Sequence, residues 1–196
     1  MQTPAFETAE KYILNRLSKE LSPALSYHGP HHTPDVMKEA MKIAAEEKLT
    51  PEEIKLLRVA IAFHDAGFIY VYQNHEEKGC EMAKEILPGF NFSEKDIELI
   101  CGMIMATKIP QSPKNKLEKI IGDADLDYLG REDVYPIAHS LFDELKTYAN
   151  LTDEKKWDEI QINFLKNHAY HTRYSQKKRR AKKNQYLQKL IKKWAK

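Results

Sequence analysis

The sequence predicts an all-α protein, a compact multi-helix bundle that ends in a basic C-terminal helix. Three observations lead to this fold class. Helix-start signals recur along the chain, apolar residues between them keep a spacing of three and four, and only residues 68–72 are rich in β-formers. We therefore expect about eight to nine helices and no sheet.

Capping residues set the expected helix starts. Thr33, followed by a proline and an acid, is expected to cap one helix, and Thr50 can form a capping box with Glu53. Ser93 and Thr152 are expected to cap two further helices. We interpret residues 68–72 as a loop or short helix. The expected loops are residues 22–30, 67–74, 88–92 and 108–114.

Charge is distributed unevenly along the 196 residues, whose formal net charge is +2. From Arg173 onward there are eleven Lys or Arg residues and no Asp or Glu, so an acidic body carries a basic tail. Leu187, Leu190, Ile191 and Trp194 follow helical spacing within this tail. We expect residues 1–172 to form the main domain, and residues 173–196 an amphipathic helix that packs on it or extends it.

Three interpretations of this tail stay open. The last helix can dock by its apolar face, with solvated lysines opposite. Tyr170, His171 and Arg173 can instead reach the active site and hold an anionic substrate. The basic face can also contact nucleic acid or an anionic membrane, but aromatic residues are too sparse there to indicate specific RNA binding.

The sequence also indicates a compartment. Cys80 and Cys101 form no CxxC motif and lie in apolar helical stretches, so a disulfide framework is not expected and a reducing compartment fits. The first five residues contain no basic segment followed by an apolar run, and we expect no signal peptide. The longest apolar run, residues 59–63, is far too short to span a bilayer. We therefore expect a cytoplasmic protein with no transmembrane segment.

An ionisable pair, His64-Asp65, directly follows this apolar run. Such groups at the buried end of a helix must be paired or ligated, because an isolated buried charge is very costly. Imidazole and carboxylate together suit zinc, iron, manganese and similar divalent ions. Asp125 presents the same question, since apolar residues surround it. Taken alone, a His-Asp pair is more often a core hydrogen bond or a surface pair, so the metal interpretation depends on the whole set.

The order of His, then His-Asp, then Asp resembles the signature of the HD superfamily of metal-dependent phosphohydrolases. Residues 27–36 look like its first motif, which class I cyclic-nucleotide phosphodiesterases share. Residues 62–67 look like the name-giving second motif, and residues 123–130 resemble the last. The resemblance implies an all-α HD-domain fold.

The resemblance also implies one divalent metal ion, held by His32, His64, Asp65 and Asp125. These ligand types accept Mn, Fe, Mg, Ni, Co or Zn, so the identity of the metal stays open. A metal-activated water would attack phosphorus. Asp65 counts as catalytic as well as a ligand. His28 matches the position that resembles the phosphodiesterase general acid, and a histidine there can protonate the leaving oxygen.

A second metal is doubtful. His75 resembles a further ligand of binuclear members of the superfamily, but those members carry another His on the next helix, where residues 104–107 contain none. We therefore expect one tightly held metal, with His75 facing substrate phosphate or a weak second ion. Lys78, Lys108 and Arg131 are further candidates for contacts with that phosphate, and Lys78 lies one helical turn from His75.

Three acids, Glu76, Asp123 and Asp127, are candidates to orient the ligand imidazoles through hydrogen bonds. The expected function is hydrolysis of a phosphoester in a small, nucleotide-like phosphorylated substrate, with phosphomonoesters and cyclic phosphodiesters both open. The alternatives are a non-catalytic HD module that senses a nucleotide, and a nucleic-acid-associated adaptor built on the basic tail. The oligomeric state, a homodimer included, stays open.

Overall fold

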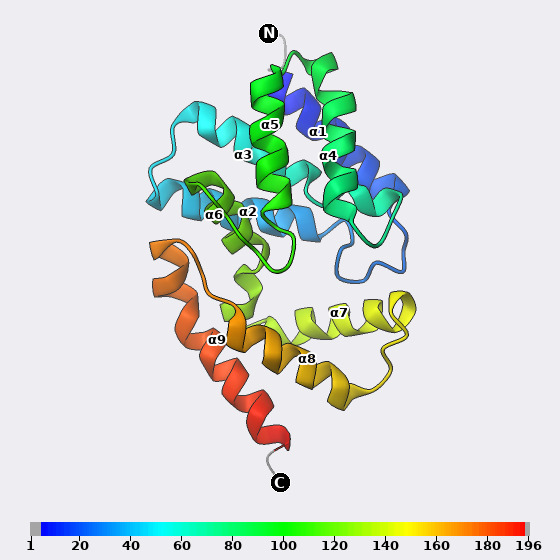
Figure 1. The fold of residues 1–196 in the computed structure, drawn as a ribbon, viewed down its shortest axis with the longest axis vertical. Helices are drawn as coiled ribbons and strands as arrows, with labels where there is room; N and C mark the ends of the chain where they lie inside the picture. Colours follow the sequence, from blue (N-terminus) through cyan, green and yellow to red (C-terminus); the bar gives the residue numbers. More distant parts are fainter. Residues whose placement is uncertain (1–4, 195–196) are drawn as a thin grey trace.

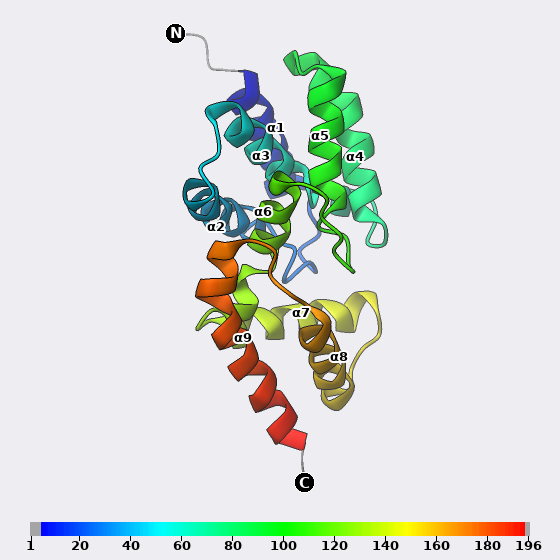
Figure 2. The ribbon, with the colours of Figure 1, turned by 60° about the vertical axis from the view of Figure 1, so that its left-hand side comes forward.

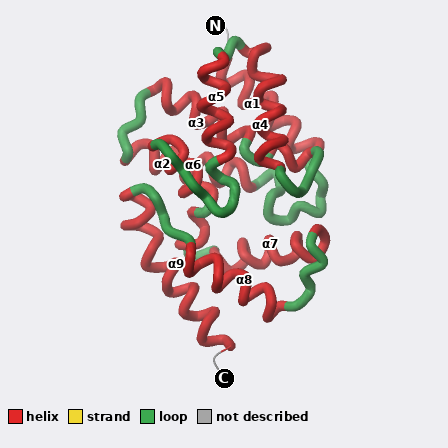
Figure 3. Tube along the Cα trace, viewed as in Figure 1, coloured by secondary structure: helices red, strands yellow, loops and turns green. Residues whose placement is uncertain are grey.

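The protein is all-α in its computed structural model, which describes residues 5–194. Residues 1–4, where no signal peptide is expected, and residues 195–196 lie outside this range. The described residues form nine α-helices and three short 3-10 helices, without a strand (Figure 3). The helices are α1 (Ala5–Glu20), α2 (His32–Glu46), α3 (Pro51–Phe63), η1 (Ala66–Ile69), α4 (His75–Ile86), η2 (Leu87–Phe90), α5 (Glu94–Met105), α6 (Lys116–Asp125), η3 (Asp127–Gly130), α7 (Val134–Tyr148), α8 (Glu154–Asn167) and α9 (Arg173–Trp194).

The helices form two groups. Helices α1 to α6 make a bundle in the upper half of Figure 1, and α7, α8 and α9 lie below it, an arrangement that the turned view in Figure 2 also shows. Each group has its own apolar core. Ile61 and Ile121 lie in the core of the first group, and Phe142 and Trp157 lie in that of the second. Burial of these side chains is the main favourable term that holds each group together.

Two of the four expected helix caps are confirmed. The side chain of Thr50 accepts the backbone N–H of Glu53 in a complete capping box, and Ser93 does the same with Asp96. The other two are wrong by one residue or two. Helix α2 already begins at His32, because the carbonyl oxygen of His31 accepts the backbone N–H of Asp35 at 3.4 Å in the first helical hydrogen bond.

The start of α8 is the second correction. Asp153, not Thr152, caps α8, and its carboxylate accepts the backbone N–H groups of Lys155 and Lys156. An ionised carboxylate is the stronger acceptor at the positive end of a helix. Residues 66–69 form the 3-10 helix η1, so the apparent β-formers that follow Gly67 are part of a short helix and loop.

Helix α9 packs against α8 and η3. Leu187 and Leu190 are buried in the second core, whereas Trp194 at the end of the helix is 39% exposed. A Cβ atom on Gly130 would lie 2.5 Å from the carbonyl oxygen of Arg179, so only glycine permits this close approach of η3 and α9. Among the described residues, no helix is both long enough and apolar enough to cross a bilayer.

Candidate functional site

Four predicted ligands meet where the ends of three helices converge. His32 is the first residue of α2, His64 and Asp65 directly follow α3, and Asp125 is the last residue of α6. Helix α2 packs on both α3 and α6, which brings these ends together. The structure therefore assembles residues that are up to 93 positions apart in the chain.

The imidazole nitrogens face the carboxylates at short range. His32 Nε2 lies 3.0 Å from Asp125 Oδ1 and 3.5 Å from Asp65 Oδ2. His64 Nε2 lies 3.3 Å from Asp65 Oδ2 and 3.6 Å from Asp125 Oδ1. Ligand atoms of His32, His64 and Asp125 all lie within 4.8 Å of one another. The geometry is that of a compact cluster able to surround one cation.

The proton arrangement of His64 explains why a cation fits. Its Nδ1 lies 2.7 Å from the carbonyl oxygen of Ile61, which can only accept, so Nδ1 carries the hydrogen. In the neutral ring, Nε2 is then a lone-pair acceptor that faces two further acceptors. His64 Nε2 and Asp65 Oδ2 are buried and have no hydrogen-bond partner among the described residues. Buried acceptors in this state are costly, and a divalent ion satisfies them together.

The electrostatics agree with this fit. Burial acts to lower the pKa of His64, but the nearby carboxylates of Asp65 and Asp125 raise it to about 9. Burial acts to raise the pKa of Asp125, yet its contacts with His32 and His64 hold that pKa far below its usual value. The cluster therefore favours positive charge at its centre, as a metal ion would supply.

His28 lies beside the cluster and is held by a carboxylate that sequence reasoning missed. His28 Nδ1 lies 2.5 Å from Oε1 of Glu144, whose Oε2 accepts the backbone N–H groups of Tyr27 and His28 at 2.9 and 3.0 Å. Tyr72 donates its hydroxyl to Oε1 at 3.1 Å. Burial acts to lower the pKa of His28, but the hydrogen bond with Glu144 and the charge of Asp65 raise it overall.

A sequence signal for Glu144 did exist. It lies on the apolar stripe of α7, at helical spacing from Ile137 and Leu141, and it is fully buried. An acid on the buried face of a helix requires a partner. What the sequence could not indicate is which partner, because His28 is 116 residues away.

His75 is the other histidine close to the cluster. Its Nε2 lies 3.7 Å from Asp65 Oδ1 and 3.5 Å from Glu76 Oε1, so the two oxygens of Asp65 face different imidazoles. The ring of Phe68 stacks on His75 with 3.8 Å between centroids, and on His28 with 4.3 Å. A Cβ atom on Gly67 would lie 2.0 Å from the carbonyl oxygen of His75, so glycine allows η1 to approach α4 this closely.

A cavity of about 630 Å³ adjoins the cluster. Asp65, Asp125, His28, His75 and Lys108 line one end of it. The pocket is within the range of small-molecule sites, roughly 300–1,000 Å³. The structure thus brings His28, His75 and Lys108 to the site, as expected, although the Nζ of Lys108 is engaged by Glu77.

Two of the predicted phosphate contacts lie elsewhere. Lys78 does not line the cavity, and its Nζ lies 2.8 Å from Glu81. Arg131 binds Asp35 and Asp133 at 2.7 and 2.9 Å and so ties η3 to α2. Neither side chain is positioned to contact a phosphate at the cluster, because each already points toward its own acidic partner.

Asp123 and Asp127 do not orient ligand imidazoles. The carboxylate of Asp123 accepts the backbone N–H groups of His171 and Thr172, both at 2.8 Å. Asp127 pairs with Arg179 at 2.8 Å. Both acids fasten the C-terminal helix to the bundle.

The residues before α9 serve the same attachment. Tyr170 is buried and donates its hydroxyl to the carbonyl oxygen of Leu126 at 3.2 Å. The described part of the 630 Å³ cavity's lining does not include Tyr170, His171 or Arg173. The structure therefore gives no support to a substrate contact from this segment.

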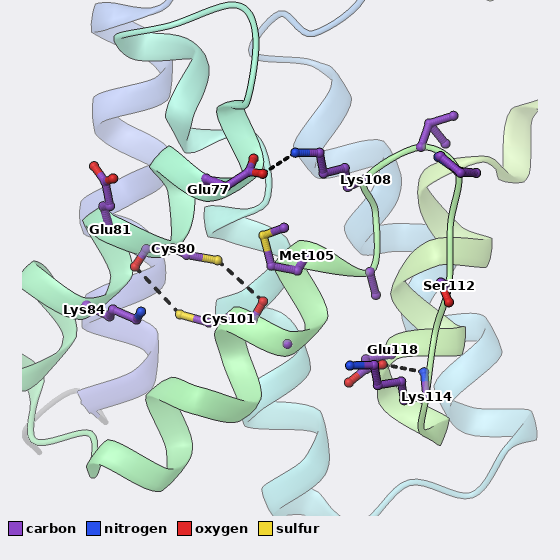
Figure 4. Close-up of a pocket in the computed structure, with 14 residues that line it drawn as sticks. Glu77, Cys80, Glu81, Lys84, Cys101, Met105, Lys108, Ser112, Lys114 and Glu118 are labelled. Atoms are coloured by element: carbon purple, nitrogen blue, oxygen red, sulfur yellow. Dashed lines mark hydrogen bonds and ion pairs between the residues drawn. The ribbon is translucent and has the colours of Figure 1, made fainter.

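A second cavity, of about 750 Å³, lies between α4, α5 and the loop before α6 (Figure 4). Cys80 and Cys101 face each other there as free thiols, and each donates to the other's carbonyl oxygen, at 3.5 and 3.7 Å. None of the four predicted metal ligands lines it. It is the larger cavity, but the chemistry-bearing cluster opens into the smaller one.

A helical bundle that gathers two His and two Asp side chains around one point is typical of all-α, metal-dependent hydrolases. The chain belongs to the HD domain family, whose model matches residues 31–128, half of the 196 residues. HD domains bind divalent metals, and the predicted superfamily and all-α fold are confirmed. No match is found among curated proteins.

Two solved structures resemble the whole chain. One is a predicted HD superfamily hydrolase from an uncultured Thermotogales bacterium, with a TM-score of 0.59, 20% identity, and coverage of 98% of this chain and 94% of that one. The other is Bacillus subtilis YpgQ in complex with ADP, with a TM-score of 0.63, 15% identity, and coverage of 97% of both chains. At these identities the likeness shows the fold alone.

Proposed function

We propose that this chain hydrolyses a phosphoester of a small, nucleotide-like molecule, with one divalent metal ion held by His32, His64, Asp65 and Asp125. The observation that carries the proposal is the pair of buried acceptors without a partner, His64 Nε2 and Asp65 Oδ2. The presence of ADP in the complex of Bacillus subtilis YpgQ supports a nucleotide-like substrate.

A divalent ion held by His32, His64, Asp65 and Asp125 would lower the pKa of water and offset negative charge on phosphoryl oxygens. The chain's own residues do the rest. Ile61 fixes the tautomer of His64, so that Nε2 is the coordinating atom. Glu144 engages Nδ1 of His28, which leaves Nε2 as the nitrogen for a proton transfer to the leaving oxygen. His75 and Lys108 line the same cavity as Asp65 and Asp125, which supports a role for both in contacting the phosphate.

A nucleic-acid adaptor is the weaker alternative, because part of the basic tail is already paired. Arg179 binds Asp127, and Lys193 lies 2.7 Å from both Glu154 and Asp158. Charges neutralised within the protein contribute less to binding of a polyanion. A nucleotide sensor would use the same cavity without turnover, and only an activity measurement separates it from an enzyme.

The test is metal analysis of the purified protein, combined with a metal-supplemented screen of nucleotides, phosphomonoesters and cyclic phosphodiesters. About one equivalent of metal is expected, with hydrolysis lost in His64→Ala and Asp65→Ala. The matched control is His139→Ala, because His139 is exposed on α7 and does not line the cavity.

The same experiment tests His28. His28→Gln is expected to keep the metal and lower kcat by roughly 10²–10⁴-fold, the usual contribution of a general acid. Metal without turnover of any ester would favour a sensor. Failure to bind any divalent ion would refute the proposal.

A further inference from the structure

The cavity has two chemically distinct ends. The charged and ionisable residues of the lining belong to the metal cluster and its surroundings, whereas η3, α7 and α8, of which α7 and α8 lie below the bundle in Figure 1, form the opposite end and contribute mostly apolar side chains. We name this opposite end the apolar chamber and define it by the side chains of Leu126, Leu129, Leu141, Leu145, Trp157, Ile160, Phe164 and Leu165. It is continuous with the cluster, because both belong to one cavity.

Polar side chains at the chamber are already hydrogen-bonded to other groups of the protein. Gln161 donates from Nε2 to Asp158 at 3.0 Å and accepts the hydroxyl of Tyr186 at Oε1, so its amide is engaged at both ends. Nearer the cluster, Thr107 donates its hydroxyl to the carbonyl oxygen of Ile104 at 2.8 Å. A ligand in the chamber therefore meets few groups with hydrogen-bonding capacity to spare.

One apolar residue of the chamber wall is half exposed. Ile160 is 49% exposed although it is apolar and lies on the chamber wall. Trp157, on the same helix, is stacked parallel to Phe142 with 5.8 Å between centroids, which gives the chamber a rigid aromatic wall. Covering such a surface with an apolar group releases water and is favourable.

We propose that the apolar chamber binds the organic group of the phosphoester by packing alone, so that the substrate class is phosphate esters of bulky aromatic or apolar groups, nucleotides included without selection among bases. This inference rests on the proposed function, because it places the phosphate at the metal cluster. The charged end of the cavity matches the phosphate of such an ester, and the apolar chamber matches its organic group. A site built on packing rejects a wrong base weakly, whereas a site built on hydrogen bonds rejects it strongly.

The experiment compares kcat/KM for 1-naphthyl phosphate and phenyl phosphate in the metal-loaded protein. The wild type is expected to prefer the naphthyl ester by roughly tenfold, the effect of burying one further ring. In Ile160→Asp this preference is expected to fall to about twofold or less, since a carboxylate would enter the chamber. The ratio cancels general effects on the catalytic machinery, because both esters use it.

Leu99→Asp is the matched control. Leu99 is 37% exposed on α5 and does not line the cavity, so it carries the same change at a comparable surface position. Its preference for the naphthyl ester is expected to equal that of the wild type. Nucleoside monophosphates whose bases have the same number of rings, the two purines or the two pyrimidines, are expected to be hydrolysed within about threefold of one another.

Two results would overturn the inference while the proposed function stands. They are an unchanged ester preference in Ile160→Asp and a preference of about a hundredfold or more for one base. If the loaded protein hydrolyses no ester, the proposed function fails, and calorimetry with 1-naphthol then decides the inference. If the wild type binds 1-naphthol and the Kd rises at least fivefold in Ile160→Asp, the inference is supported. If the wild type does not bind 1-naphthol, the inference is refuted.

Discussion

The carboxylate of Glu144 lies 2.5 Å from Nδ1 of His28 and, through its second oxygen, accepts the backbone N–H of the same residue. One acid on α7 thus fixes both the ring and the backbone of a histidine in the loop before α2. The charge of Glu144 also contributes to the raised pKa of His28. Two groups of helices are joined at this point.

Replacing Glu144 should change the pH profile of catalysis. If His28 acts as the acid, it must be protonated, so activity falls as pH rises through its pKa. Glu144→Gln removes the charge that helps to raise this pKa, and the alkaline limb of kcat is expected to move to lower pH. Asp143→Asn, an exposed change on the same helix, is the control. An alkaline limb that stays in place in Glu144→Gln would contradict the assignment of His28.

Metal binding should stabilise the folded protein. An ion that binds only the native state at one hundred times its Kd contributes about 2.7 kcal/mol. For a chain of this size that corresponds to a rise in Tm of about 5–10 °C. His64→Ala should abolish the rise, and His75→Ala should retain one tightly bound equivalent. Calorimetric Tm values with and without chelator measure the rise, and metal analysis measures the bound equivalent. Loss of that equivalent in His75→Ala would refute the single-metal assignment.

His168 should make stability sensitive to acid. Burial, together with the charge of Lys183, lowers the pKa of His168 to about 3, against about 6.5 in an unfolded chain. The unfolded state therefore takes up the proton first, and stability falls as pH drops from about 6.5 toward 3. The expected loss by pH 5 is at most about 2 kcal/mol.

The comparison that isolates this effect is His168→Gln against the wild type, by urea unfolding at pH 7 and pH 5. The variant should lose less stability between the two values. His139→Gln controls for removal of a histidine from an exposed site. An equal loss in wild type and His168→Gln would show that His168 is not the origin of the acid sensitivity.

The two thiols should differ in reactivity. The neighbouring Cys80 and the charge of Lys84 lower the pKa of Cys101 to about 7 against the effect of burial, whereas the pKa of Cys80 is raised well above its usual value. Both line the 750 Å³ cavity. Alkylation by iodoacetamide, followed by peptide mass spectrometry, should label Cys101 with a midpoint near pH 7. Cys80→Ala should raise that midpoint, and equal labelling of both residues would contradict the assignment.

Sequence reasoning predicted the helices because capping and apolar spacing are local patterns, and the resemblance to the HD superfamily selected the four residues that the structure brings together. The capping box at Thr50 and the His64-Asp65 pair at the end of an apolar helix carry their own physical explanation. The proposed phosphate contacts were less predictable. Helical spacing places Lys78 one turn from His75, but the nearby Glu81 provides it with an ion pair outside the cavity.

Long-range contacts account for the remaining differences. Asp123 and Asp127 lie in a motif that resembles a metal-binding segment, yet they hold the start of α9 and Arg179. Their partners are about 50 residues further along the chain, and no local pattern links them. Glu144 escaped prediction for the same reason.

The apolar chamber lies largely beyond the region that the family model matches. The matched region ends at residue 128, whereas α7 and α8 begin at Val134 and Glu154. The four proposed ligands and most of the chamber therefore lie in different stretches of the chain, and Glu144 on α7, which holds His28, connects the two. Mutation of the chamber residues can change the substrate preference of such a protein while its four proposed metal ligands are inherited unchanged. By this route one ancestral hydrolase can give rise to descendants with different substrates.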